Sequence, residues 1–275
     1  MMLGVMQVNE ALDSARVFLC LAFLTYSSWS DLKKREVSNM VWVAFAPLAL
    51  ALTSLQYFLF APQFLLLYAL SFAATSALSI VLFYAGAFGG ADAKALICLS
   101  LALPTYPIYF LHPFFSYVVV PLFPITIFCN AVLLAALSVF YAITRNCLWK
   151  GRTGKRLFEG FEKESKWRKA LTILCGYKVE AAELEKGGYL YPLEDVHVSE
   201  AGEIERKLIV MPKDEEREKV IERILNAARR GKLPKEVWVT PGLPFLVFIT
   251  AGFIVALIFG DIVWVILRSA LGQGS

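Results

Sequence analysis

The sequence has few charged residues and only a small excess of one sign. Asp, Glu, Lys and Arg make up 18% of the 275 residues, hydrophobic residues make up 58%, and the formal net charge is +4. Several windows run for about 18 or more residues with almost no charge, which is the length that a helix needs to cross a bilayer. The composition excludes an ordinary water-soluble domain and indicates a polytopic α-helical membrane protein. We expect the lipid bilayer, and no nucleic acid, among its partners.

The sequence is also poor in residues that bind metals or support redox chemistry. Its five cysteines form no C-x-x-C pair, and only two histidines, His112 and His197, are available as further ligands. Structural zinc sites need four such ligands at close, paired spacings. We therefore expect neither a metal site nor a cofactor.

A cleavable secretory signal is missing from the first thirty residues. Glu10, Asp13 and Arg16 stand where a basic region is usual, and no small-residue cleavage site follows. The first apolar segment is therefore predicted to be retained. In all we expect six spanning helices, at about residues 16–30, 40–58, 64–85, 93–111, 117–144 and 243–267.

Most of the charge lies between the fifth and sixth predicted spans, in residues 145–239. Alternating stretches such as "GGYLYPLEDVHVS" and "ERKLIVMP" indicate strands, and residues 214–230 indicate a helix with Asp214 as its N-cap. We expect a small α+β domain here, between a membrane part of residues 1–144 and a last helix and tail of residues 240–275. The buried stripe of the predicted helix is Val220, Ile221, Ile224, Leu225 and Ala228.

Apart from Arg16, at the start of the first predicted span, the basic residues of the membrane part lie in alternate loops. Lys33, Lys34 and Arg35 follow the first span and Lys94 follows the third, whereas the loops at 59–63 and 112–116 contain neither Lys nor Arg. Cytoplasmic loops carry an excess of these residues. The basic loops and the α+β domain are therefore predicted to be cytoplasmic.

Two aspartates are predicted to reach the cytoplasmic face from different helices. Asp31 ends the first span and Asp92 begins the fourth, while Asp261 falls in the outer half of the sixth and cannot join them. Ionisable residues at membrane depth are functional candidates because an unpaired charge in lipid is costly. The polar run "TYSSWSD" before Asp31 suggests a wet cavity. Only about 18 Å of helix separates Asp92 from Pro104, which suggests that the site is recessed.

Two carboxyl groups that share a site suggest aspartic protease chemistry. Close like charges do not both ionise easily, so one group can take a proton from water while the other, protonated, polarises a carbonyl. Gly89 and Gly90 would let the chain turn sharply before Asp92 and admit an extended substrate. The competing interpretation is structural, because an aspartate at a helix end is often an N-cap or a topology anchor. Lys94 could tune Asp92 or anchor the loop inside.

Two motifs carry a family resemblance. "SDLKKREVSN" resembles the D-x-x-x-R-x-[IV]-x-N pattern after the first helix of type IV prepilin peptidases, with Asp31, Arg35 and Asn39 at the defining positions. Arg35 and Asn39 are expected to fix the loop after Asp31, with Asn39 capping the second helix. "GGADAKAL" is similar to the G-x-G-D motif of the same family, with Asp92 as the second aspartate and Ala91 in place of the second glycine.

The order of the predicted elements extends the resemblance over the whole chain. "TPGLPFL" resembles the P-x-x-P-F entry to a late helix in these enzymes, and a soluble insert before the last helix is the arrangement of the archaeal preflagellin peptidases. The resemblance implies an aspartic endopeptidase that removes a short basic leader from preflagellins or type IV prepilin-like proteins. The cysteine-rich loop linked to N-methylation in bacterial members is missing, so no methyltransferase activity is expected.

Two other interpretations stay open at this point. A presenilin-like or signal-peptide-peptidase-like protease also uses a G-x-G-D aspartate, but Ser30 replaces the tyrosine before its first aspartate and no P-A-L motif is present. A transporter or membrane scaffold could use the aspartates to bind an ion or to set topology, although such proteins often show internal repeats and charges near the midplane.

Overall fold

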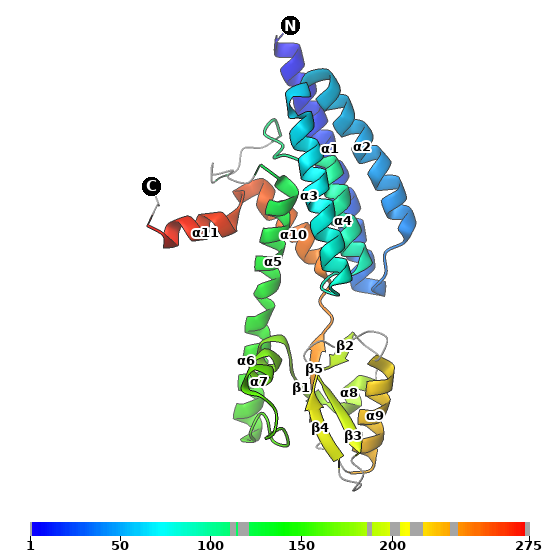
Figure 1. Ribbon diagram of the computed structural model, residues 1–275, viewed down its shortest axis with the longest axis vertical. Coiled ribbons are helices and arrows are strands. Elements are labelled where there is room, and N and C mark those ends of the chain that lie inside the picture. Colours follow the sequence, from blue (N-terminus) through cyan, green and yellow to red (C-terminus); the bar gives the residue numbers. More distant parts are fainter. Residues whose placement is uncertain are drawn as a thin grey trace. The chain divides into compact units, whose positions relative to one another are not determined.

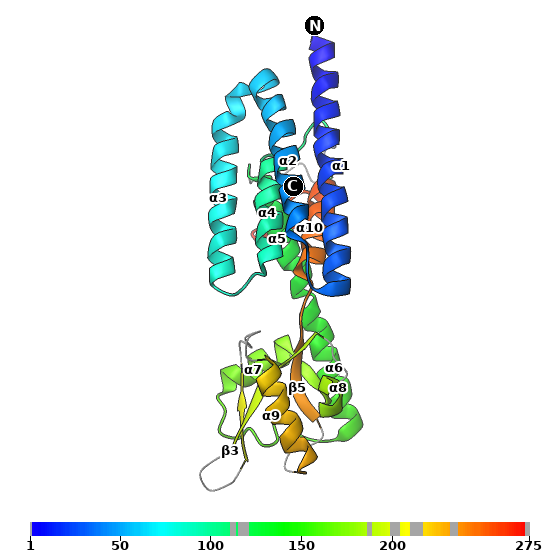
Figure 2. The same ribbon diagram turned by 90° about the vertical axis from the view of Figure 1, so that its right-hand side faces the viewer.

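The computed structural model describes residues 2–110, 114, 121–185, 189–198, 204–209, 217–231 and 236–272. The chain divides into two compact units (Figures 1 and 2). The first, which we call the membrane unit, comprises Met1–Ala136 with Pro244–Ser275, and the second comprises Leu137–Leu243.

The membrane unit contains helices and connecting loops, and no strand, in the residues that the structure describes. The long helices of its first half lie side by side as a bundle, and α5 lies beside α10 (Figure 1). Its elements are α1 (Met2–Lys34), α2 (Asn39–Phe60), the 3-10 helix η1 (Pro62–Phe64), α3 (Leu65–Tyr84), α4 (Gly90–Ala102), α5 (Phe123–Ala136), α10 (Phe245–Phe259) and α11 (Ile262–Ala270).

Among the described residues, three helical stretches are long and apolar enough to cross a bilayer. They are Asn39–Phe60, Pro62–Tyr84 and Phe123–Thr153, and the bent pair of α10 and α11 makes a fourth if it counts as one span. The chain is thus a largely helical membrane protein with a smaller unit that contains strands.

The first and fourth predicted spans differ in length from the expectation. α1 begins at Met2 rather than near residue 16, because Asp13 and Arg16 pair with each other inside the bundle and need no water. α4 has 13 residues and ends at Ala102 rather than near residue 111. The residue before a proline is pushed out of the helical region, and Leu103, which precedes Pro104, is extended at φ −135° and ψ 69°.

The last predicted span is not one straight helix. α10 and α11 are bent by 62° at Gly260 and Asp261. Gly260 has a φ of +79°, which favours glycine, and the Asp261 carboxylate accepts a hydrogen bond from the Trp264 N–H at 3.0 Å. Asp261 is therefore the N-cap of α11. The prediction that it lies within one continuous helix is wrong.

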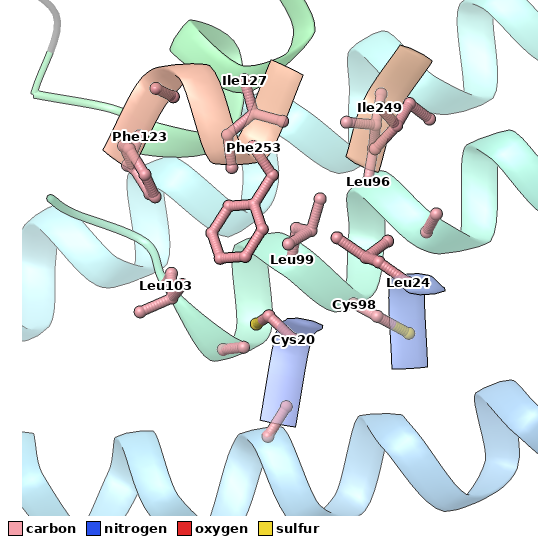
Figure 3. Packing of buried hydrophobic residues seen from close by; sticks show 14 of the residues in the cluster. Cys20, Leu24, Leu96, Cys98, Leu99, Leu103, Phe123, Ile127, Ile249 and Phe253 are labelled. Carbon is pink, nitrogen blue, oxygen red and sulfur yellow. The ribbon is translucent and has the colours of Figure 1, made fainter. Parts of the chain in front are cut away.

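The apolar core of the membrane unit surrounds α4. Leu96, Leu99 and Leu103 are fully buried and pack with side chains from α1, α5 and α10, among them Leu24 and Phe253 (Figure 3). α10 approaches α5 closely at Gly252, where a Cβ would lie 2.7 Å from the Ala131 nitrogen. Close packing on all sides holds the short helix α4 in place.

The second unit combines helices with two small antiparallel sheets. β5 (Glu236–Pro241) pairs with both β1 (Tyr177–Glu180) and β2 (Leu190–Pro192), and β3 (Glu194–Val198) pairs with β4 (Ile204–Leu208). β2, β3 and β4 confirm the two strand-like stretches of the sequence, whereas β1 and β5 were not predicted. The helices of this unit are α6 (Ser138–Thr153), α7 (Lys166–Cys175), α8 (Ala181–Glu185) and α9 (Arg217–Arg229).

The helix predicted from residue 214 is described from Arg217 as α9. Its buried residues Val220, Ile224 and Ala227 pack on the sheet, with Ile221 and Ala228 partly buried beside them. The predicted N-cap Asp214 lies outside the described residues. The fifth predicted span also extends beyond residue 144, because α6 continues to Thr153 and ends at Gly154, which has a φ of +66°.

Candidate active site

Asp31 lies in the last turn of α1, where the chain reverses direction. The Arg35 N–H donates to the Asp31 carbonyl at 2.9 Å, and the Ser30 hydroxyl donates to the Glu36 carbonyl at 2.7 Å. Arg35 has a φ of +55°, an uncommon conformation for a residue with a side chain. These bonds fix the turn directly after Asp31.

α2 begins differently from the expectation. The hydroxyl of Ser38 accepts a hydrogen bond from the Met40 N–H at 3.4 Å, so Ser38 is the N-cap and Asn39 is the first helical residue. The predicted cap at Asn39 is wrong. Its amide oxygen instead accepts from the Lys94 ammonium at 2.6 Å, which ties the start of α2 to the first turn of α4.

Asp92 is the third residue of α4, and its carboxylate is held by the backbone. The Gly89 N–H donates to Asp92 Oδ2 at 3.0 Å, which satisfies one of the amide groups that a helix start leaves unpaired. A Cβ on Gly89 would lie 3.1 Å from the same oxygen, whereas one on Gly90 would make an ordinary 3.6 Å contact with the Phe83 ring. Gly89 thus gives the carboxylate its space.

The two aspartates are brought together from different helices. The charge of Asp31 acts on the Asp92 carboxyl group more weakly than burial and the Gly89 N–H do, and the charge of Arg35 acts on the Asp31 carboxyl group. Both side chains are partly exposed. Asp261 is buried at the C-terminal end of α10, where this helix meets α11.

The residues around the aspartates pack against the start of α10. The Phe88 ring, directly before Gly89, lies 5.0 Å from the Phe245 ring, and the Ser28 hydroxyl donates to the Leu246 carbonyl at 3.0 Å. The three motifs singled out in the sequence therefore converge. Phe88 and Phe245 are contacts that sequence reasoning missed, because single aromatic residues in an apolar chain carry no periodic signal.

The serines before Asp31 have a structural use that the sequence did not reveal. Ser28 also shares a hydrogen bond of 2.7 Å with the Thr250 hydroxyl, and Ser30 is bonded to the loop. Ser27 and Ser28 are buried between helices. The Ser28 hydroxyl holds α1 against α10, whereas the buried Ser27 hydroxyl has no hydrogen-bond partner among the described residues. Ser28 therefore does not line the wet cavity that this stretch predicts.

No group of three or more His, Cys, Asp or Glu side chains that could hold a metal ion occurs in the described residues. The chemistry available at this site is that of two carboxyl groups, one lysine and backbone N–H groups. Two carboxyl groups on membrane helices are typical of membrane proteases that use a pair of aspartates, and this is the class for which the protein is a candidate.

Comparison with known proteins supplies the family. Residues 18–142 match the type IV leader peptidase family, and residues 168–262 match the archaeal peptidase A24 C-terminus, type II. The chain belongs to the type IV leader peptidase family and is a peptidase. This assignment favours the first of the three interpretations that the sequence left open.

The relatives are archaeal and are matched over nearly their whole length. A preflagellin peptidase of Methanococcus voltae is 27% identical over 242 residues, which are 86% of this chain and 92% of the relative. Preflagellin peptidases of Methanocaldococcus jannaschii and Methanococcus maripaludis are 26% and 25% identical, over 90% and 86% of this chain and 95% and 92% of the relatives.

Proposed function

We propose that this chain is an aspartic endopeptidase that removes the short basic leader from preflagellins or type IV prepilin-like proteins. The observation that carries the proposal is the placement of Asp31 at the end of α1 and of Asp92 at the start of α4, where the Lys94–Asn39 bond ties α4 to the start of the helix that follows α1. The relatives named preflagellin peptidase support the substrate class. No methyltransferase activity is expected.

The mechanism that we propose uses a water molecule between the two carboxyl groups. One group, ionised, takes a proton from the water as it attacks the scissile carbonyl, and the other, protonated, donates to the carbonyl oxygen. The resulting tetrahedral intermediate breaks the C–N bond when the amine leaves with a proton. Because the Gly89 N–H engages Asp92 Oδ2, the other oxygen of Asp92 is left to contact the water.

We propose that the site faces the cytoplasm and that six helices cross the bilayer. α1 and α4 would be the spans beyond the three or four apolar stretches, since both pack into the same core as α2, α5 and α10. Lys33, Lys34 and Arg35 lie beside Asp31, and Lys94 lies in the turn that carries Asp92, which favours the cytoplasmic side for this end of the membrane unit.

Replacing each aspartate tests the mechanism. The protein is co-expressed with a preflagellin that carries its leader, and cleavage is followed by the change in substrate mass. Asp31→Asn and Asp92→Asn should each lower the cleavage rate by at least about 100-fold, because an amide neither accepts the proton nor donates it as a carboxyl group does.

Asp261→Asn is the matched control. Asparagine caps helices as well as aspartate does, so this variant should keep the α11 N-cap and cleave at close to the wild-type rate. Normal leader removal by either active-site variant would refute the two-aspartate mechanism. Loss of activity in Asp261→Asn, at unchanged protein level, would refute the placement of the site.

A further inference from the structure

α4 covers only part of the fourth proposed span, because its helical residues are shorter than the hydrocarbon core and the non-helical residues after Ala102 must complete the crossing. Its 13 residues span about 20 Å, against about 30 Å for the hydrocarbon core. The last carbonyl groups of a helix have no hydrogen-bond donor within the helix, and in a membrane no bulk water is present to donate to them. Other parts of the unit must therefore supply the donors.

Side chains of two neighbouring helices converge on the last carbonyl of α4. The Arg16 guanidinium of α1 donates to the Ala102 carbonyl through Nη1 at 3.1 Å, and the Thr53 hydroxyl of α2 donates to the same oxygen at 2.9 Å. Just beyond, the Ser71 hydroxyl of α3 donates to the Pro104 carbonyl at 2.8 Å. The end of α4 is thus fastened to all three helices of the first half of the chain.

The buried charge of Arg16 is compensated by a carboxylate. Arg16 and Asp13 are each 2% exposed and form an ion pair, and the Gln56 amide and the Tyr109 N–H both donate to the Asp13 carboxylate at 3.1 Å. A buried charge is costly unless it is paired and hydrogen-bonded. A cation at the C-terminal end of a helix also interacts favourably with the helix dipole.

We propose that Arg16 is a positioning residue for the proposed peptidase, on whose function this inference rests. α1 carries both Arg16 and Asp31, and α4 carries both Ala102 and Asp92. The bond from Arg16 to Ala102 fixes how far α4 is shifted along α1, and a packed helix transmits that shift to its other end. Catalysis is sensitive to such shifts, since a misplacement of about 1 Å can cost about 100-fold in rate.

A double substitution separates positioning from folding. Arg16→Met alone would leave the Asp13 charge unpaired, so Asp13→Asn is made with it. The new asparagine side chain can still accept from the Tyr109 N–H. Its amide nitrogen can donate to the Gln56 amide oxygen, which has no partner in the described structure, once the Gln56 amide, whose nitrogen faces position 13, turns over. Replacing a buried ion pair by neutral groups is often neutral for stability. The double variant should fold, with kcat at least about tenfold lower and KM within about twofold of wild type.

Thr53→Val and Asn130→Ala form the matched comparison. Thr53→Val removes one hydrogen bond to α4, and Asn130→Ala removes buried hydrogen bonds that join α5 to the bend between α10 and α11. Thr53→Val should lower kcat several-fold and Asn130→Ala should change it less than about twofold. Wild-type kcat in the double variant, or equal losses in Thr53→Val and Asn130→Ala, would overturn the proposal.

A second readout does not depend on cleavage. A cysteine at position 92 (Asp92→Cys) is labelled with a maleimide in a background where the exposed Cys147 and Cys175 are replaced by serine. Adding Asp13→Asn/Arg16→Met should change the labelling rate by at least about threefold, and adding Asn130→Ala should not. Equal rates would overturn the positioning role. If the labelling rates differ but the wild-type protein cleaves no preflagellin, the positioning role stands and only the proposed function is refuted.

Discussion

At the scale of single residues, Ala91 is the position where the second motif departs from glycine. It is the second residue of α4, and Arg35 is the one non-glycine residue with a positive φ in the described part of the chain. The backbone at Ala91 therefore has no need of glycine. The motif requires a small residue at Gly89, where space beside the Asp92 carboxylate is limited.

Ala91→Gly should leave the cleavage rate within about twofold of wild type. Its cost should appear in stability instead, since glycine in place of alanine destabilises a helix by up to about 1 kcal/mol. Thermal unfolding of the purified protein in detergent, together with the preflagellin cleavage assay, measures both effects. A large loss of activity at unchanged stability would contradict this account of Ala91.

Gly89→Ala and Gly90→Ala should differ sharply. The added methyl group at position 89 would lie 3.1 Å from Asp92 Oδ2 and push the carboxylate aside, so the cleavage rate should fall at least about tenfold. At position 90 the methyl group would only touch the Phe83 ring, and the rate should stay within about twofold. Similar rates in the two variants would show that the Asp92 carboxylate tolerates displacement.

Lys94 and Asn39 should act as one pair. If the hydrogen bond between them is the main use of Lys94, then Lys94→Met and Asn39→Leu should each lower the cleavage rate modestly, and the double variant should be no worse than either. If Lys94 acts on Asp92 independently of Asn39, the two effects should multiply. A double-mutant cycle on the cleavage rate distinguishes these outcomes.

At the scale of elements, the bend between α10 and α11 is built by several groups. The Asn130 amide of α5 donates to the Gly260 carbonyl at 2.9 Å, and its oxygen accepts from the Ile262 N–H at 3.1 Å. The side chain of Asn130 is fully buried. It thus pairs two backbone groups that the break in the helix would leave unsatisfied.

Asn130→Ala should therefore destabilise the membrane unit without harming the chemistry. Two buried backbone groups lose their partner, at about 1–3 kcal/mol each. We expect a lower unfolding temperature in detergent and an unchanged cleavage rate per folded molecule. An unchanged unfolding temperature would mean that water or lipid replaces Asn130 at the bend.

At the scale of the whole molecule, the second unit has its own ionisable core. Lys178 is 8% exposed, and its ammonium lies 4.2 Å from the centre of the Trp149 ring. Close by, the side chain of Glu194 is fully buried. Its carboxylate accepts hydrogen bonds from Arg206 of β4 and from the Trp238 N–H of β5, and these two bonds join the two sheets. Burial, together with the positive charge of Arg206, lowers the pKa of Lys178 from 10.5 to about 8.

This pKa makes the stability of the second unit depend on pH. Between about pH 8 and 10.5 the unfolded chain holds a proton on Lys178 that the folded chain has lost, so the free energy of unfolding should rise with pH in that window. Lys178→Met should raise the stability at pH 7 and remove this rise. Exposed Lys150 provides the control, Lys150→Met, and denaturant unfolding followed by tryptophan fluorescence provides the measurement.

Local signals sufficed for much of the architecture. Hydropathy located α2, α3 and α5, and alternation located β2, β3 and β4. The ends of helices were harder to predict, because they depend on partners distant in sequence. Ser38 rather than Asn39 caps α2, and α1 extends past Asp13 and Arg16 because the two side chains neutralise each other inside the bundle.

The sequence by itself determined that this is a membrane protein, that its charge gathers in one segment, and that Asp31 and Asp92 are the carboxylates to examine. Composition, periodicity and local motifs are properties of neighbouring residues, so they can be read along the chain. Only the tertiary structure decided that Arg16 reaches Ala102, that Lys94 reaches Asn39 and that Asp261 caps a bent helix. The first of these contacts joins residues 86 positions apart, and such contacts form because buried polar groups must find partners wherever the packing of helices brings them together.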